Sequence, residues 1–132
     1  MNSYARSVFT QARTAGYGAL ESLSISRTVQ AFDTAESEGL VRLEALPDED
    51  FDLEGFSDIP GVVEEARKAI ERGDGPYGVV ASCLTESGEW HQADSCWGFV
   101  GYRDVLSPVE NPYVVDLMRS ALAAIPDPAA AI

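Results

Sequence analysis

The feature that most constrains the fold is a pair of strand-like runs separated by a short polar turn. Residues Tyr77 to Thr85 and Glu89 to Tyr102 flank Glu86-Ser87-Gly88, and a glycine supplies the positive φ that a tight hairpin turn needs. The two runs are therefore predicted to form an antiparallel hairpin centred on this turn. That centre places Cys83 opposite His91 across the two strands.

Helical spacing of apolar residues, with the usual start and stop residues, predicts four helices and one further strand. The helices are expected over Ser3–Ala15, from about Ser24 or Ser26 to Glu38, from Pro60 through Arg72 and from Asn111 to Pro126, and the strand over Leu40–Leu46. Gly39 is placed to end the second helix in the left-handed conformation. Asn111 and Pro112 fit the N-cap and the first helical position of the last helix.

The expected order α-α-β-α-β-β-α indicates an α+β fold with a small antiparallel sheet and helices packed on one face. A chain of 132 residues with 45% hydrophobic residues has the size and the core of a single compact domain, residues 1–132. Residues 1–46 form a helical, nearly neutral part and residues 47–132 an acidic α+β part. Residues 126–132 are expected to be a flexible tail.

In the third helix, expected from Pro60 through Arg72, the residues expected to face inward, with Ile59 just before it, are Ile59, Val62, Val63, Ala66 and Ile70.

The charge of the chain is strongly negative and unevenly placed. The chain has 22 acidic and 9 basic residues, a formal net charge of −13. Of this, −1 falls in residues 1–46 and −12 in residues 47–132. Because sequence-independent nucleic-acid affinity comes from Lys and Arg neutralising phosphates, direct nucleic-acid binding is not expected. The expected partner is instead the basic surface of a protein or ribonucleoprotein.

The acids are densest between Glu44 and Glu65, where nine carboxylates occur without a basic residue. The stretch Pro47 to Asp58 reads PDEDFDLEGFSD, an acidic loop with aromatic residues inside it. It lacks the glycine and the final glutamate that an EF-hand calcium loop requires. The residues expected to bind a partner are Asp48, Glu49, Asp50, Asp52, Glu54, Asp58, Glu64 and Glu65, with Phe51, Phe56 and Trp90 as apolar anchors.

The two cysteines and the one histidine are the next candidates for chemistry. Cys83, His91 and Cys96 are spaced C-x7-H-x4-C, unlike the closely paired ligands of zinc sites. Two half-buried, reduced thiols and a surface histidine are therefore expected, with no metal, cofactor or catalytic residue. A small enzyme that uses Cys83 and His91 remains an alternative.

The segment Trp90 to Gly101, WHQADSCWGFVG, is the most distinctive of the chain. Its glycines and aromatic residues predict a core strand with a bend or bulge. Trp97 is expected in the core, and Trp90, next to the turn, at the surface. A protein interface anchored by an aromatic residue is the functional alternative.

Common phosphate-binding, dinucleotide-binding, zinc-protease and esterase motifs do not occur in the sequence. No stretch reaches the ~20 apolar residues of a membrane span, and residues 1–14 lack the apolar region of a signal peptide. A cytoplasmic protein without membrane contact is therefore expected.

Residues 19–46 resemble the second and third helices and the first wing strand of a winged helix-turn-helix domain. The stretch AFDTAESEGLVRLEALPDED carries the likeness, through its E-x-x-G-L-V pattern. Because the segment is acidic where the family places Arg and Lys, the resemblance implies a regulator or adaptor that works through protein contacts, with a homodimer as one form.

The size, the charge of −13 and the WHQADSCWGFVG block followed by YVVDLMRSAL resemble the small acidic anti-defence proteins of phages and plasmids, of the anti-CRISPR or antirestriction type. The resemblance implies a non-enzymatic inhibitor in the cytoplasm of a bacterial host cell, acting as a DNA mimic on a nucleic-acid-handling complex. An acidic excess that only keeps a small domain soluble is the alternative.

Overall fold

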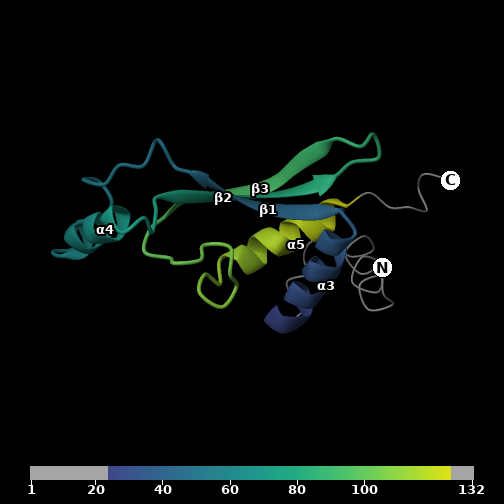
Figure 1. The fold of residues 1–132 in the computed structure, drawn as a ribbon, viewed down its shortest axis with the longest axis horizontal. Coiled ribbons are helices and arrows are strands. Elements are labelled where there is room, and N and C mark those ends of the chain that lie inside the picture. Colours follow the sequence, from purple (N-terminus) through teal and green to yellow (C-terminus); the bar gives the residue numbers. More distant parts are fainter. Residues whose placement is uncertain (1–23, 126–132) are drawn as a thin grey trace.

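Three helices and three strands make up the part of the chain that the computed structural model describes, residues 24–125 (Figure 1). The elements are α3 (Ile25–Ser37), β1 (Val41–Pro47), α4 (Val62–Glu71), β2 (Tyr77–Leu84), β3 (Trp90–Phe99) and α5 (Val114–Ala124). The predicted α+β class is confirmed. The helix expected over Ser3–Ala15 and the tail expected over 126–132 lie outside the described residues.

The strands form one antiparallel sheet in the order β1-β2-β3. The hairpin turn closes where predicted: the Thr85 amide donates to the Glu89 carbonyl at 2.8 Å, and Gly88 has a φ of 84°. Cys83 pairs with His91, as the predicted register requires. β3 ends at Phe99, before the predicted Tyr102, because Phe99 already pairs with Tyr77, the first residue of β2. Gly98, with a φ of 83°, lies within β3 beside an irregularity in the ladder.

Helices α3 and α5 cover one face of the sheet (Figure 1). Phe32 of α3, Leu122 of α5 and Val79 of β2 are among the largest fully buried side chains of the core. α3 begins at the Ser24 cap, whose side chain accepts a hydrogen bond from the Arg27 amide. It ends before Gly39, which has a φ of 77°, as the sequence predicts. This face of the sheet carries the hydrophobic core.

The prediction that all helices pack on this face is wrong for α4. That helix projects past one end of the sheet (Figure 1) and makes no broad contact with the strands or the other helices. It begins at Val62 after Gly61, not at Pro60, and its buried residues are Ala66 and Ala69. Ile59, expected inward, is 66% exposed. Val62, Val63 and Ile70, also expected inward, are only half-buried, so the apolar side of α4 is partly covered.

Asn111 does not cap the last helix, so that prediction is also wrong. Helix α5 starts at Val114, with Tyr113 in the N-cap position and no side-chain cap. The Asn111 side chain is fully buried and donates from Nδ2 to the Val105 carbonyl at 2.9 Å. It thereby closes the loop that leads from β3 to α5.

We expect Asn111→Ala to lower the free energy of unfolding by about 1–2 kcal/mol, because it leaves the buried Val105 carbonyl without its donor. Urea unfolding followed by circular dichroism measures the change. The matched control is Asn111→Asp, which keeps the shape but replaces the donor with a buried carboxylate, and it should be worse than alanine. Equal stability of all three proteins would contradict the structural role of this side chain.

Candidate functional site

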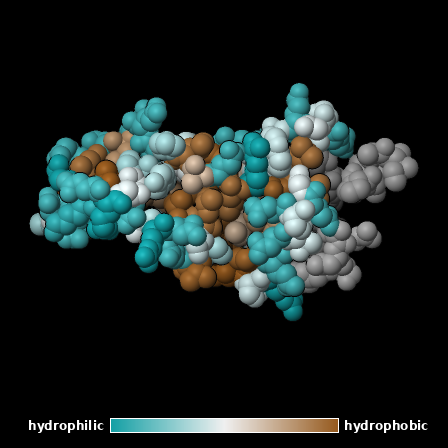
Figure 2. All heavy atoms as spheres, in the orientation of Figure 1, coloured by the Kyte–Doolittle hydropathy of each residue, from teal (hydrophilic) through white to brown (hydrophobic). Residues whose placement is uncertain are grey.

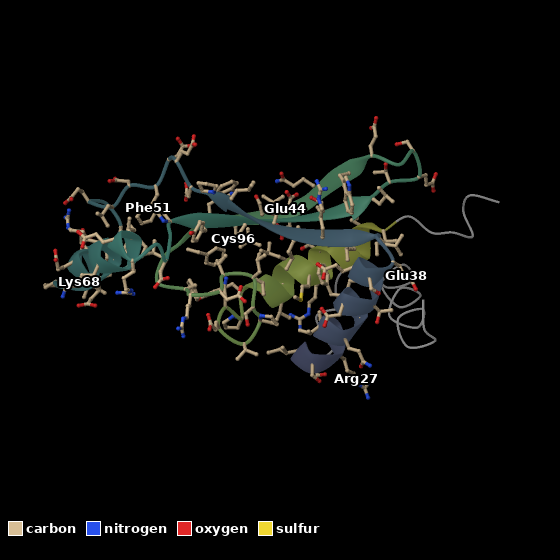
Figure 3. All side chains as sticks on the ribbon, viewed as in Figure 1. Arg27, Glu38, Glu44, Phe51, Lys68 and Cys96 are labelled. Atoms are coloured by element: carbon tan, nitrogen blue, oxygen red, sulfur yellow. The ribbon has the colours of Figure 1, made fainter. Side chains whose placement is uncertain are left out.

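The acidic loop, residues 48–58, leaves the end of β1 and leads into α4. Its two aromatic residues pack on each other, with the Phe51 and Phe56 ring centroids 5.3 Å apart and the planes at 55°. Figure 3 shows Phe51 near α4, at the end of the molecule where Lys68 also lies. In Figure 2 hydrophilic residues cover most of this end. The aromatic pair therefore gives the loop a small apolar centre, and its carboxylates lie around it.

The candidate carboxylates fall into two groups. Glu54 and Glu64 both contact Arg67, with N···O distances of 3.0 and 3.4 Å, and Glu65 lies 3.6 Å from Lys68. The hydrogen bond that Arg67 donates to Glu54 raises the pKa of Arg67. These are exposed ion pairs, which contribute little stability but cancel charge locally. Helix α4 holds three acids, Glu64, Glu65 and Glu71, against the two cations Arg67 and Lys68, so its net charge is only −1.

The second group has no such neutralisation. Within residues 24–125, no lysine or arginine lies within 4.0 Å of a carboxylate of this group. Its members, all at least partly exposed, are Asp48, Glu49, Asp50, Asp52 and Asp58. Most of the uncompensated negative charge of this end thus lies on the loop, and Glu71 is the carboxylate of α4 that forms no ion pair within the described residues.

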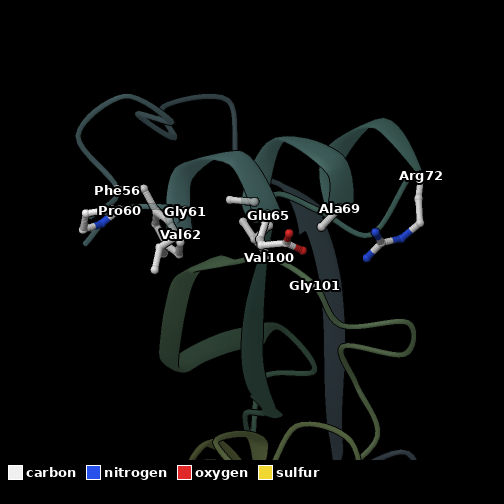
Figure 4. A pocket seen from close by; sticks show the side chains of 10 residues that line it. Phe56, Pro60, Gly61, Val62, Glu65, Ala69, Arg72, Val100 and Gly101 are labelled. Atoms are coloured by element: carbon white, nitrogen blue, oxygen red, sulfur yellow. The ribbon is translucent and has the colours of Figure 1, made fainter. Parts of the chain in front are cut away.

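A shallow depression of about 570 Å³ lies between α4 and the chain that follows β3 (Figure 4). Phe56, Val62 and Ala69 contribute apolar walls, and Glu65 and Arg72 are its charged lining residues. Arg72 is paired with Asp74 at 3.1 Å. The depression therefore offers an apolar surface beside the acidic loop. Its two charged lining residues, Glu65 and Arg72, each lie in an ion pair, with Lys68 and Asp74.

Trp90 lies far along the sheet from the other predicted site residues. It pairs with Leu84 next to the hairpin turn, whereas the acidic loop follows Pro47, which pairs with Tyr77 at the other end of β2. The guanidinium of Arg42 sits 4.1 Å from the centre of the Trp90 ring. The structure brings Phe51 and Phe56 together with the acids and places Trp90 at the opposite end.

The prediction that Trp97 lies in the core is wrong, because its side chain is 48% exposed. The ring lies on Gly78 of β2, where a Cβ atom would collide with it. Its Nε1 donates to Ser95 Oγ at 3.2 Å. The neighbouring Cys96 packs against the core, so strand alternation already directs Trp97 to the other face. Gly78, inside a strand of larger residues, was the second available signal.

The Cys83–His91 pair lacks the properties of a nucleophilic site. Cys83 is 1% exposed, its Sγ donates to the Ala124 carbonyl at 3.4 Å, and burial raises its pKa. Reactive cysteines instead have a lowered pKa and solvent access. Both Cys83, which is buried, and Cys96, which is half-buried, are free thiols. Among the described residues no group of three or more His, Cys, Asp or Glu side chains is arranged to hold a metal ion.

The chain matches no family model, no curated protein and no solved structure in comparisons with known proteins. None of the helices within residues 24–125 has the length and apolar character to cross a membrane.

In the segment that resembles a winged-helix domain, α3 does lead through Gly39 into β1. The partner of β1, however, is β2, which follows only after the acidic loop and α4.

Proposed function

We propose that the protein is a non-enzymatic inhibitor whose acidic loop binds the basic surface of a nucleic-acid-handling bacterial defence complex. The observation that supports this proposal most is the concentration of five accessible, unneutralised carboxylates in one loop at one end of the fold. A cleft that binds DNA or RNA is lined with Lys and Arg. Such a cleft attracts a cluster of carboxylates for the same reason that it attracts phosphates.

The electrostatics favour fast capture by such a cleft. Opposite potentials raise association rates by ~10 to 10³ at low salt. The carboxylates of α4 add less, because Arg67 and Lys68 lie against them. The DNA-mimic form of the proposal thus rests on the loop, where four acids fall within residues 48–52 and no basic residue lies between them.

The test compares two variants that carry the same net charge. The loop variant has Asp48→Asn, Glu49→Gln, Asp50→Asn and Asp58→Asn, and the control variant has Asp33→Asn, Glu36→Gln, Glu86→Gln and Glu89→Gln. Each removes four acids that are at least partly exposed and changes the net charge from −13 to −9. An exposed ion pair between a loop carboxylate and a basic group of the target contributes about 0.5 kcal/mol to binding. Losing four such pairs should therefore weaken target binding about thirtyfold.

Phage plating on cells with a restriction or CRISPR system provides the readout, followed by co-purification of the inhibited complex. Wild type and the control variant should protect the phage and recover the complex, and the loop variant should do neither. Equal protection by both variants would reject the loop as the contact. Absence of protection by the wild type in every system would reject the inhibitor proposal itself.

The second candidate function is an acidic winged-helix-like regulator or adaptor that acts through protein contacts. The passage from α3 through Gly39 into β1 is the observation in its favour. For such a protein, substitution of the exposed α3 residues Arg27 and Gln30 by alanine should abolish partner recovery, and the loop variant should leave it intact. A small enzyme using Cys83 and His91 has no comparable support.

A further inference from the structure

The face of the sheet opposite α3 and α5 is uncovered by any described helix (Figure 1). We call it the open face. Strand alternation and the pairing register place on it Arg42, Glu44 and Leu46 of β1, Val80, Ser82 and Leu84 of β2, and Trp90, Gln92, Ser95 and Trp97 of β3. Two large exposed aromatic side chains on one sheet face are typical of an interaction surface.

The two tryptophans of the open face differ in what already contacts them. The ring of Trp90 is stacked with Arg42 at 4.1 Å, and Arg42 Nε also lies 2.9 Å from Glu44. Within the described part of the chain no arginine or lysine is stacked on Trp97. One side of its ring rests on Gly78 and Ser95 holds its Nε1. The ring of Trp97 is fixed in place, and its outer side is available to a cation from another molecule.

Trp97 also lies at the end of the open face that adjoins the acidic loop. Leu46, an exposed side chain, pairs with Gly78, the residue beneath the Trp97 ring. Asp48, two residues after Leu46 and the first residue of the acidic loop, donates its amide hydrogen to the Pro76 carbonyl at 3.0 Å. An aromatic anchor beside an aliphatic residue, with the acidic loop beginning two residues after that aliphatic residue, complements an arginine-rich surface, since guanidinium groups both stack on rings and pair with carboxylates.

We propose that the loop end of the open face, Trp97 with Leu46, is the apolar anchor for the same basic partner that the acidic loop attracts. This inference rests on the proposed function and adds the arginine-rich chemistry of the partner surface. In it the loop supplies attraction and Trp97 supplies a central, desolvated contact, as aromatic hot spots do in other interfaces. Trp90 takes no part, because Arg42 already occupies its ring.

The test uses an octa-arginine peptide as the probe and the intact protein. In a Trp90→Phe variant Trp97 is the single tryptophan, so a saturable change in its emission reports contact at this site. We expect Trp97→Ala to weaken peptide binding at physiological salt about tenfold. Trp90→Ala is the matched control, since it removes the same side chain from the same face, and it should change binding less than twofold. Leu46→Ala should also weaken binding, which keeps the test valid if Trp97→Ala folds poorly.

Three other results of the octa-arginine binding test would each contradict part of the proposal. If the peptide binds and Trp97→Ala and Leu46→Ala both bind like wild type, the anchor is rejected while the acidic-loop proposal stands. If the loop variant binds the peptide as well as the charge-matched control variant does, the electrostatic contact of the proposed function fails. If Trp97 emission follows protein concentration and not peptide, the open face belongs to a second copy of the chain and the proposal is overturned.

Discussion

Replacing Phe32 with alanine should lower the free energy of unfolding by about 3–5 kcal/mol, the usual cost of removing a buried aromatic side chain. Phe32 is 1% exposed and is the largest of the fully buried side chains. It belongs to the core cluster in which α3 meets α5 and the sheet. Because small domains have only about 5–15 kcal/mol of stability, the variant should unfold far earlier in urea.

The matched control for this prediction is Phe56→Ala in the acidic loop. Phe56 is 40% exposed and packs on Phe51, so its removal should cost about 1 kcal/mol, the value of an aromatic pair with limited burial. Urea unfolding followed by far-ultraviolet circular dichroism measures both variants. Similar losses for the two phenylalanines would contradict the placement of the core between the sheet and the helices α3 and α5.

The elements that the sequence predicts well are those defined by local chemistry. The hairpin follows from two strand-like runs around Gly88, and its register follows from the turn, so the Cys83–His91 pairing could be predicted. The ends of α3 follow from Ser24 and Gly39, whose cap and left-handed conformation are properties of the residues themselves. Where a short segment determines its own geometry, sequence reasoning succeeds.

The failures at α4 and at Asn111 depend on which surfaces meet. The apolar spacing over Pro60–Arg72 correctly predicts a helix but says nothing of what covers it, and α4 lies beyond the sheet. Asn111-Pro112 has the residues of a helix start, but the buried bond to the Val105 carbonyl places Asn111 in the preceding loop. For the site, the acidic loop was visible as a run of carboxylates. Its division into paired and unpaired acids depends on Arg67 and Lys68, whose side-chain positions the sequence does not give.

Gly78→Val should destabilise the protein by about 3 kcal/mol, the upper part of the usual cost of overpacking. A side chain at this position collides with the Trp97 ring, so the indole has to leave the sheet and lose its contact with the strand. The intrinsic preference of valine for strands works in the opposite direction, which makes the ring the decisive factor. Tryptophan emission in a Trp90→Phe background should shift to the red, because Trp97 then becomes fully hydrated.

A double-mutant cycle separates this collision from a backbone effect. If the Trp97 ring is the obstacle, Gly78→Val introduced into Trp97→Ala should cost less than about 0.5 kcal/mol, or stabilise the sheet through the strand preference of valine. If the valine costs the same in both backgrounds, Gly78 is required for the conformation of β2 and the ring is not held by it. The first outcome would establish that a glycine in the central strand supports the exposed ring on which the proposed partner contact depends.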